Sequence, residues 1–250
     1  MTAAAALRLN RLHPSPCEEV EAAAAYAYPE PDGRYLRVNM VSSVDGCAVL
    51  DGRVGALTGP ADQRLLVLLR SLADVLLVGA ATVRAEGYGP VRTRPELREL
   101  RAANGQLPAA RLAVVSRTID VDLGSRAFTD AVERPLVVTT ELAGRDRVRE
   151  ARRVADVLVA GERTVDLGVA TDRLLEAGMP RMLSEGGPHL LADLYASDLV
   201  DELCLAISPL VTCGEGSRIT AGPVLPTLRP QRLQTVLERD EFLFLRYVRC

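Results

Sequence analysis

The sequence contains no lysine and no tryptophan, and it contains only two histidines. All 30 of its basic residues are arginines, so a Schiff-base lysine and the lysine of a phosphate-binding P-loop are both excluded. His13 and His189 lie far apart in the chain, which leaves little material for a histidine-based triad or metal centre. We therefore predict no metal site.

The cysteine pattern and the hydropathy exclude further classes. The five cysteines are odd in number and form no Cys-x-x-Cys pair, so neither a zinc site nor a disulfide framework is indicated. No apolar run reaches the length of a transmembrane helix, and the first twelve residues lack the apolar core of a secretory signal. We expect a reduced, cytoplasmic protein with no membrane partner.

The charge balance argues against a polyanionic partner. A net charge of -3 and a pI near 5.6 give no basic surface for nucleic acid or for an anionic membrane. A chain of 250 residues with 48% hydrophobic content is long enough to bury a sizeable core. A small molecule is the expected partner.

Apolar runs alternate with amphipathic segments, which is typical of an α/β protein. The strands predicted for its parallel part are 35–41, 74–79, 111–115, 136–140, 157–160 and 181–184. After a helix at 188–195, three strands at 199–207, 232–237 and 242–248 follow without helices and predict a closing antiparallel section. We expect residues 34–250 to form a single domain with a mostly parallel sheet, preceded by a loosely attached extension at 1–33.

The most informative stretch is Leu183–Leu191, which predicts a strand, a glycine pair and a helix. Gly186 and Gly187 can turn sharply and expose backbone N–H groups, and Pro188 suits the first turn of a helix. Such a turn favours a phosphate or diphosphate, and the carboxylate of Glu185 directly precedes it. An ordinary tight turn is the alternative.

Other polar residues follow predicted strands. Ser43 and Asp45 lie in a turn after the first strand, and Asp62 lies in the first turn of a helix, where it either complements the helix dipole or faces a cleft. Ser116 and Arg117 end another strand and suit the 2′-phosphate of NADP, although a solvated strand end is the alternative. The carboxyl ends of parallel strands share one edge of a sheet, so we expect one common cleft.

Several motifs in order resemble the NADPH-dependent pyrimidine reductases of riboflavin biosynthesis, whose fold is similar to dihydrofolate reductase. They are Asn39–Gly46, Ala73–Glu86, Ser184–Pro188 and Leu199–Leu203. The nearest resemblance is to stand-alone, actinobacterial-type members, because of Gly59–Asp62 and the Glu-Gly-Tyr-Gly run at 86–89. The zinc deaminase signature that often precedes the reductase in bacteria is missing, so we expect the reduction alone.

This resemblance implies NADPH as the cofactor, lying across the sheet. The positions that it assigns to the cofactor are Ser43, Asp45, Gly79, Ala80, Thr82, Val83, Ser116, Arg117, Thr139, Gly186 and Gly187. Among them, Ser116 and Arg117 would bind the 2′-phosphate, Gly186 and Gly187 would hold the diphosphate, and Thr139 would lie near the adenosine.

The implied reaction is hydride transfer to C1′ of a ribosylamino-pyrimidine 5′-phosphate, giving the ribitylamino compound, as in a 5-amino-6-(5-phosphoribosylamino)uracil reductase. The residues assigned to this substrate are Asn39, Asp62, Arg70, Arg92 and Glu185, and Ser43 and Asp45 would also face it. The candidate catalytic residues are Glu185, Asp62 and Asn39. Glu185 and Asp62 would accept hydrogen bonds from the pyrimidine, and Arg70 and Arg92 would bind its phosphate.

Three questions stay open at this stage. The first is which group contacts the pyrimidine carbonyl or the sugar oxygen, because many bacterial members have lysine where this chain has Asn39, whereas archaeal-type members have asparagine. A reductase that acts on a pterin such as dihydrofolate, or a non-catalytic NADP-binding module, would explain part of the same pattern. Phe242, Phe244 and Tyr247 are concentrated in a chain with 4% aromatic residues, and we expect them to pack across a sheet edge in a homodimer, with core packing as the alternative.

Overall fold

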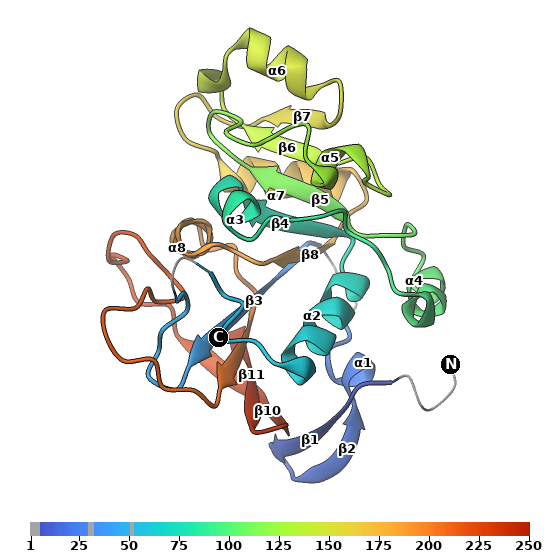
Figure 1. Ribbon diagram of the computed structural model, residues 1–250, viewed down its shortest axis with the longest axis vertical. Helices are drawn as coiled ribbons and strands as arrows, with labels where there is room; N and C mark the ends of the chain where they lie inside the picture. The colour runs from blue at the N-terminus through green and yellow to red at the C-terminus, as the bar shows by residue number, and fades with distance from the viewer. Residues whose placement is uncertain (1–5, 30–32, 51–52) are drawn as a thin grey trace.

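The computed structural model describes residues 6–29, 33–50 and 53–250, and its strands form one sheet (Figure 1). The strands are β1 Arg8–His13, β2 Cys17–Glu21, β3 Tyr35–Ser43, β4 Val75–Gly79, β5 Arg111–Val115, β6 Leu136–Thr139, β7 Asp156–Val159, β8 Arg181–Ser184, β9 Glu202–Ser208, β10 Gln231–Arg239 and β11 Phe242–Arg249. Their spatial order is β2-β1-β10-β11-β9-β3-β8-β4-β5-β6-β7.

Helices cover both faces of the sheet. They are α1 Ala22–Ala25, α2 Pro60–Leu72, α3 Ala80–Ala85, α4 Arg98–Ala103, α5 Arg126–Thr129, α6 Arg145–Ala151, α7 Leu167–Glu176 and α8 Pro188–Ala196, with 3₁₀ turns η1 Pro95–Leu97 and η2 Glu141–Ala143. Strand alternation divides the core in two. Leu76 and Val78 of β4 point into the cluster under α2, α3, α5 and α6, whereas Val75 and Leu77 point into the cluster under α7 and α8.

The prediction of a mostly parallel α/β sheet with an antiparallel section is confirmed. Strands β9, β3, β8, β4, β5, β6 and β7 pair parallel with one another in that order, and the pairs from β9 through β11, β10 and β1 to β2 are antiparallel. One detail differs. Strand β9, expected in the antiparallel part, is parallel to β3 on one side and antiparallel to β11 on the other, so it joins the two parts.

The expectation of a loosely attached segment before residue 34 is wrong for the part of it that the structure describes. Strand β1 pairs with β10, and Leu9, Ala22 and Tyr26 are completely buried in the core. Strand β2 has the sequence Cys-Glu-Glu-Val-Glu, in which three of five residues are acidic. This composition lacks the apolar alternation by which a strand is recognised in a sequence.

A buried ion cluster fixes this segment to the sheet. The Glu202 carboxylate accepts hydrogen bonds from Arg37 at 2.9 Å and from Arg246 at 2.7 Å, and Arg37 and Glu202 are fully buried. Arg37 also donates to the carbonyl of Tyr26 at 2.8 Å, and its guanidinium lies 4.2 Å from the ring centroid of Tyr28. Three arginine and glutamate side chains thus connect the N-terminal residues to β3, β9 and β11.

The expectation that Phe242 and Phe244 pack across a sheet edge is also wrong. Their rings stack on each other with centroids 6.0 Å apart, and both are buried on the α2 face of the sheet. Strand β1 covers the outer edge of β10, so β10 and β11 do not form an edge. Tyr247 lies half-buried with the other core cluster. Core packing, the alternative, accounts for both phenylalanines.

Candidate active site

A cavity of about 570 Å³ opens near the carboxyl ends of β3, β4 and β8. Its polar wall contains Asn39, Thr58, Asp62, Arg70, Thr82, Glu86, Tyr88 and Glu185, and Gly187 and Pro188 form another part. The sequence predicted this edge because parallel strands place their carboxyl ends together. The three candidate catalytic residues, Asn39, Asp62 and Glu185, all lie in the wall of this cavity.

Asp62 lies in the first turn of α2, which begins at Pro60 after the extended residue Gly59. A Cβ atom on Gly59 would lie 2.8 Å from the ring of Phe242, so glycine allows this helix start to pack on the core. The Asp62 side chain is only 6% exposed, and no arginine of the described residues forms an ion pair with it. Burial raises the pKa of Asp62 to about 6, and the neighbouring Thr58 hydroxyl acts in the opposite direction.

Glu185 is held by two side chains from other elements. Arg70 of α2 donates from Nε to Oε1 and from Nη2 to Oε2, both at 2.6 Å, and the Tyr88 hydroxyl donates to Oε2. Burial lowers the pKa of Arg70, but the Glu185 carboxylate more than offsets this and the pKa is raised. Arg70 is the only basic residue that the described residues contribute to the cavity wall, and its charge is neutralised there.

The glycine turn after β8 approaches β4 and α3 closely. Gly186 has a φ of +75°, which suits glycine, and its carbonyl accepts a hydrogen bond from Gly79 N at 2.7 Å. The Gly186–Gly187 peptide is cis. A Cβ atom on Gly187 would lie 2.5 Å from Thr82 Oγ1. The Thr82 side chain thus occupies the space that a side chain at residue 187 would need, and glycine allows α3 to lie against the turn.

Substitution of Gly187 by alanine is expected to lower the free energy of unfolding by about 1–3 kcal/mol, because the new methyl group collides with Thr82 Oγ1. Urea unfolding measures this change. The double variant Thr82→Ala with Gly187→Ala is expected to recover most of the loss, since the remaining Thr82 Cβ would lie 3.9 Å away. Thr82→Ala alone is the control, and no recovery in the double variant would contradict the collision.

Ser43 and Asp45 do not line this cavity. Asp45 accepts hydrogen bonds from the Ser43 hydroxyl, from Thr212 N at 3.2 Å and from Cys213 N at 2.8 Å, and these bonds hold its pKa below the usual value. The Ser43 hydroxyl also accepts from Cys47 N at 2.9 Å. In this structure the two side chains connect the loop at Thr212 and Cys213 to the end of β3 by hydrogen bonds.

The residues predicted for the cofactor separate into two groups, one near the cavity and one at the ends of β5 and β6. In the first group, Thr82 and Gly187 line the cavity, and Ala80 and Val83 of the same helix α3 are buried in the core. Ser116, Arg117 and Thr139 form the second group at the ends of β5 and β6, where Thr139 Oγ1 donates to the Arg117 carbonyl at 3.1 Å. The buried Ser116 hydroxyl accepts from Asp120 N at 3.0 Å, and the Arg117 side chain is exposed.

The two arginines predicted for a substrate phosphate lie in different surroundings. Arg70 is in the cavity wall but is paired with Glu185. Arg92 is exposed, lies outside the residues that line the cavity and donates to the Asp130 carbonyl at 3.3 Å. The sequence did not single out Thr58 or Tyr88, although the Glu-Gly-Tyr-Gly loop was recognisable as a segment near the site.

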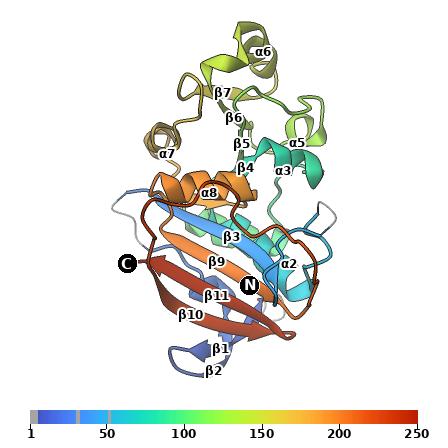
Figure 2. The ribbon, with the colours of Figure 1, turned by 90° about the vertical axis from the view of Figure 1, so that its left-hand side faces the viewer.

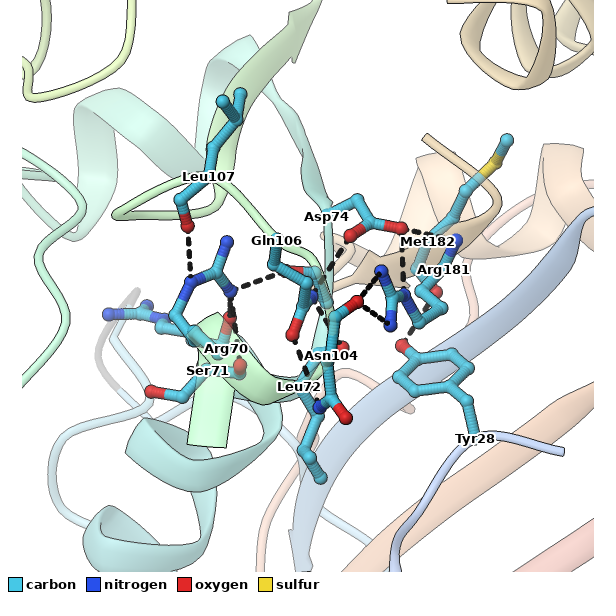
Figure 3. A network of polar contacts seen from close by, with 12 residues as sticks. Tyr28, Arg70, Ser71, Leu72, Asp74, Asn104, Gln106, Leu107, Arg181 and Met182 are labelled. Atoms are coloured by element: carbon cyan, nitrogen blue, oxygen red, sulfur yellow. Dashed lines mark hydrogen bonds and ion pairs between the residues drawn. The ribbon is translucent and has the colours of Figure 1, made fainter. Parts of the chain in front are cut away.

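A second polar network anchors the opposite end of α2 (Figure 3). The buried Arg101 guanidinium donates to the carbonyls of Ser71 at 3.0 Å and Ala73 at 2.7 Å, and Gln106 donates to the Leu72 carbonyl at 3.0 Å. These donors satisfy the free carbonyl groups that end a helix. Helix α2 is therefore fixed at its far end while its first turn carries Asp62.

No helix of the described residues is long and apolar enough to span a membrane. Within the same residues, no group of three or more His, Cys, Asp or Glu side chains is arranged to hold a metal ion.

A mostly parallel sheet with a polar cavity at its strand ends, beside a glycine turn and a helix start, is the arrangement of α/β enzymes that bind a small molecule at this edge of the sheet. Comparison with known proteins gives the family. The chain belongs to the RibD C-terminal domain family, whose model matches residues 34–239.

Its relatives are named as reductases. The 2,5-diamino-6-ribosylamino-4(3H)-pyrimidinone 5′-phosphate reductase of Archaeoglobus fulgidus is 33% identical over 184 residues, covering 73% of this chain and 84% of that protein. The enzyme of the same name from Methanothermobacter thermautotrophicus is 31% identical over 185 residues, covering 74% and 82%. This chain is accordingly an oxidoreductase and not a non-catalytic binding module.

A solved structure shares the fold. The crystal structure of a pyrimidine reductase-like protein from Corynebacterium diphtheriae matches with a TM-score of 0.78 and 28% identity, covering 87% of this chain and 92% of that one. The resemblance found in the sequence motifs is confirmed.

Proposed function

We propose that this protein reduces 2,5-diamino-6-ribosylamino-4(3H)-pyrimidinone 5′-phosphate to its ribitylamino form in riboflavin biosynthesis, with NADPH as the reductant. The observation that supports this proposal best is the buried carboxylate of Asp62 in the cavity wall, which has no arginine partner among the described residues. A 2-amino group and an adjacent ring N–H are two donors side by side, and a carboxylate accepts both. The names of the archaeal relatives point to the same, non-deaminated substrate.

The side chains would act by binding and orientation. Asp62 would accept the pyrimidine donors, Glu185 would accept one further hydrogen bond through Oε1, and the Asn39 amide would contact the polar atoms between them. The acids outnumber the single, neutralised arginine in this wall, so the substrate phosphate is best accommodated at the mouth of the cavity.

The residues present fit a dinucleotide. A Cβ atom on Gly187 would collide with Thr82 Oγ1, so glycine lets α3 lie against this turn, and helix α8 starts there with backbone N–H groups that suit a diphosphate. Ser116 and Arg117 would hold the 2′-phosphate, with an exposed guanidinium beside a hydroxyl. NADPH, when bound, supplies the hydride that reduces C1′ of the sugar.

Absorbance at 340 nm tests the proposal. Purified protein is given NADPH or NADH with the diamino-pyrimidinone phosphate, its deaminated counterpart or dihydrofolate. We expect kcat/KM for the diamino compound to exceed the others by about 100-fold, or roughly 2.7 kcal/mol in the transition state, and NADPH to be preferred to NADH. Comparable turnover of dihydrofolate would mean that Asp62 binds the similar edge of a pterin.

We also infer a homodimer in the cytoplasm. Leu205, Ile207, Leu243, Leu245 and Tyr247 lie on the face of β9 and β11 opposite α2 and are all partly exposed. Figure 2 shows that no described helix lies in front of these strands. An apolar sheet face of this kind suits a second copy of the chain. Sedimentation at low micromolar concentration that gives only a 26.9 kDa species would contradict the dimer.

A further inference from the structure

The carboxylate of Glu185 has little free hydrogen-bonding capacity. An ionised carboxylate offers about four acceptor positions. Two are taken by the Arg70 fork, one on each oxygen, and the Tyr88 hydroxyl takes a second position on Oε2. No other donor of the described residues reaches this carboxylate, so one acceptor position remains, and it lies on Oε1. Because the Glu185 side chain is 6% exposed, water has little access to that position.

Tyr88 reaches this carboxylate from a loop that is itself fixed at several points. Tyr88 N donates to the Val83 carbonyl at 3.1 Å, so the loop continues from the end of α3. Glu86 in the same loop accepts a hydrogen bond from Val54 N at 2.9 Å, on another part of the cavity wall. The Tyr88 ring lies 5.5 Å from the Arg70 guanidinium, which adds a cation–π contact.

We propose that Tyr88 is a positioning residue for the reduction, and that it makes Oε1 of Glu185 the only atom of that carboxylate open to the substrate. This inference rests on the proposed function. The terminal torsion of a glutamate side chain is broad, and the arginine fork alone leaves a free position on each oxygen. With the Tyr88 hydroxyl present, a substrate donor has one position to occupy and therefore one orientation.

Tyr88→Phe in the full chain is the direct test, because it removes the hydroxyl and keeps the ring beside Arg70. We expect kcat to fall about 10- to 100-fold, the effect of one hydrogen bond to a charged group. The KM for the pyrimidine phosphate is expected to change less than about 3-fold, and NADPH affinity, measured by fluorescence, is expected to stay unchanged. Tyr195→Phe, on α8 outside the cavity wall, is the matched control.

A double-mutant cycle separates positioning from a general structural role. In a Glu185→Gln background, Tyr88→Phe is expected to change kcat less than about 2-fold, because the carboxylate that it positions is already gone. An equal loss in both backgrounds would overturn the inference, as would a Tyr88→Phe enzyme with wild-type kcat. No turnover of any ribosylamino-pyrimidine phosphate by the wild type would overturn the proposed function and this inference together.

Discussion

Replacement of Glu202 by alanine is expected to lower the free energy of unfolding by about 3–5 kcal/mol. The wild-type carboxylate accepts from Arg37, Arg246 and Tyr35 at 2.7 to 2.9 Å in a fully buried position. Without it, two largely buried guanidinium groups lose their only ion-pair partner among the described residues. Urea unfolding of the purified chain measures the difference.

An exposed carboxylate provides the control for Glu202. Glu176→Ala removes an ion pair with Arg173 whose side chains are both 62% exposed, and we expect a loss of only about 0–1 kcal/mol. A Glu202→Ala protein within about 1 kcal/mol of wild type would contradict the expected role of the buried cluster.

The Glu202 effect depends on pH in a defined direction. Burial alone would raise the pKa of Glu202, but Arg37 and Arg246 more than offset it and lower the pKa to about 2. A lowered carboxyl pKa stabilises the protein above the unfolded value near 4.5, and this contribution is lost as pH falls toward 2. The stability difference between wild type and Glu202→Ala is therefore expected to shrink between pH 4.5 and 2.

Asp62→Asn is expected to lower kcat/KM about 100-fold or more, because a pyrimidine donor is left facing another donor in a buried site. The asparagine protein is also expected to be more stable than wild type by roughly 1–3 kcal/mol at neutral pH. The reason is the pKa of Asp62, raised to about 6 by burial, which shows that the folded protein disfavours the charged form. Steady-state kinetics and urea unfolding measure the two effects.

The pH dependence of Asp62 has the opposite sign to that of Glu202. A raised carboxyl pKa contributes stability below the unfolded value near 3.8, and that contribution is lost as pH rises through about 6. The advantage of Asp62→Asn should therefore grow between pH 3.8 and 6 and be complete above 6, and wild-type kcat/KM should rise with pH up to about 6 as the carboxylate ionises. Activity that instead falls through this range would mean that protonated Asp62 is the active form. Asp172→Asn, at a 65% exposed carboxylate, is the control.

Most of the parallel α/β part was predictable because its signals are local. Runs such as Val75–Gly79 are wholly apolar, and Pro60 and Pro188 mark helix starts directly. The cavity edge followed from topology, since parallel strands place their carboxyl ends together. For Asp62 the residues alone left the helix dipole and the cleft as alternatives, and its place beside Glu185 was implied by the family resemblance; the structure has both side chains in one wall.

The parts that the sequence did not predict depend on distant contacts. The pairing of Arg70 with Glu185 joins residues 115 positions apart, and Arg37 meets Glu202 across 165 positions. Nothing local distinguishes these arginines from exposed ones in a chain with 30 basic residues. Asp45 was expected to contact a ligand, but its carboxylate accepts a hydrogen bond from Thr212 N, 167 positions away in the sequence.

The N-terminal strands have a consequence for how this protein avoids association through its sheet. Without them, the nine residues of β10 would present unpaired backbone groups to other chains. With them, the sheet ends instead at the five-residue strand β2, which carries Glu18, Glu19 and Glu21. Glu19 also adopts a φ of +54°, which interrupts the extended backbone at that edge. A short, bent and acidic border disfavours pairing with a strand of another copy at this edge of the sheet.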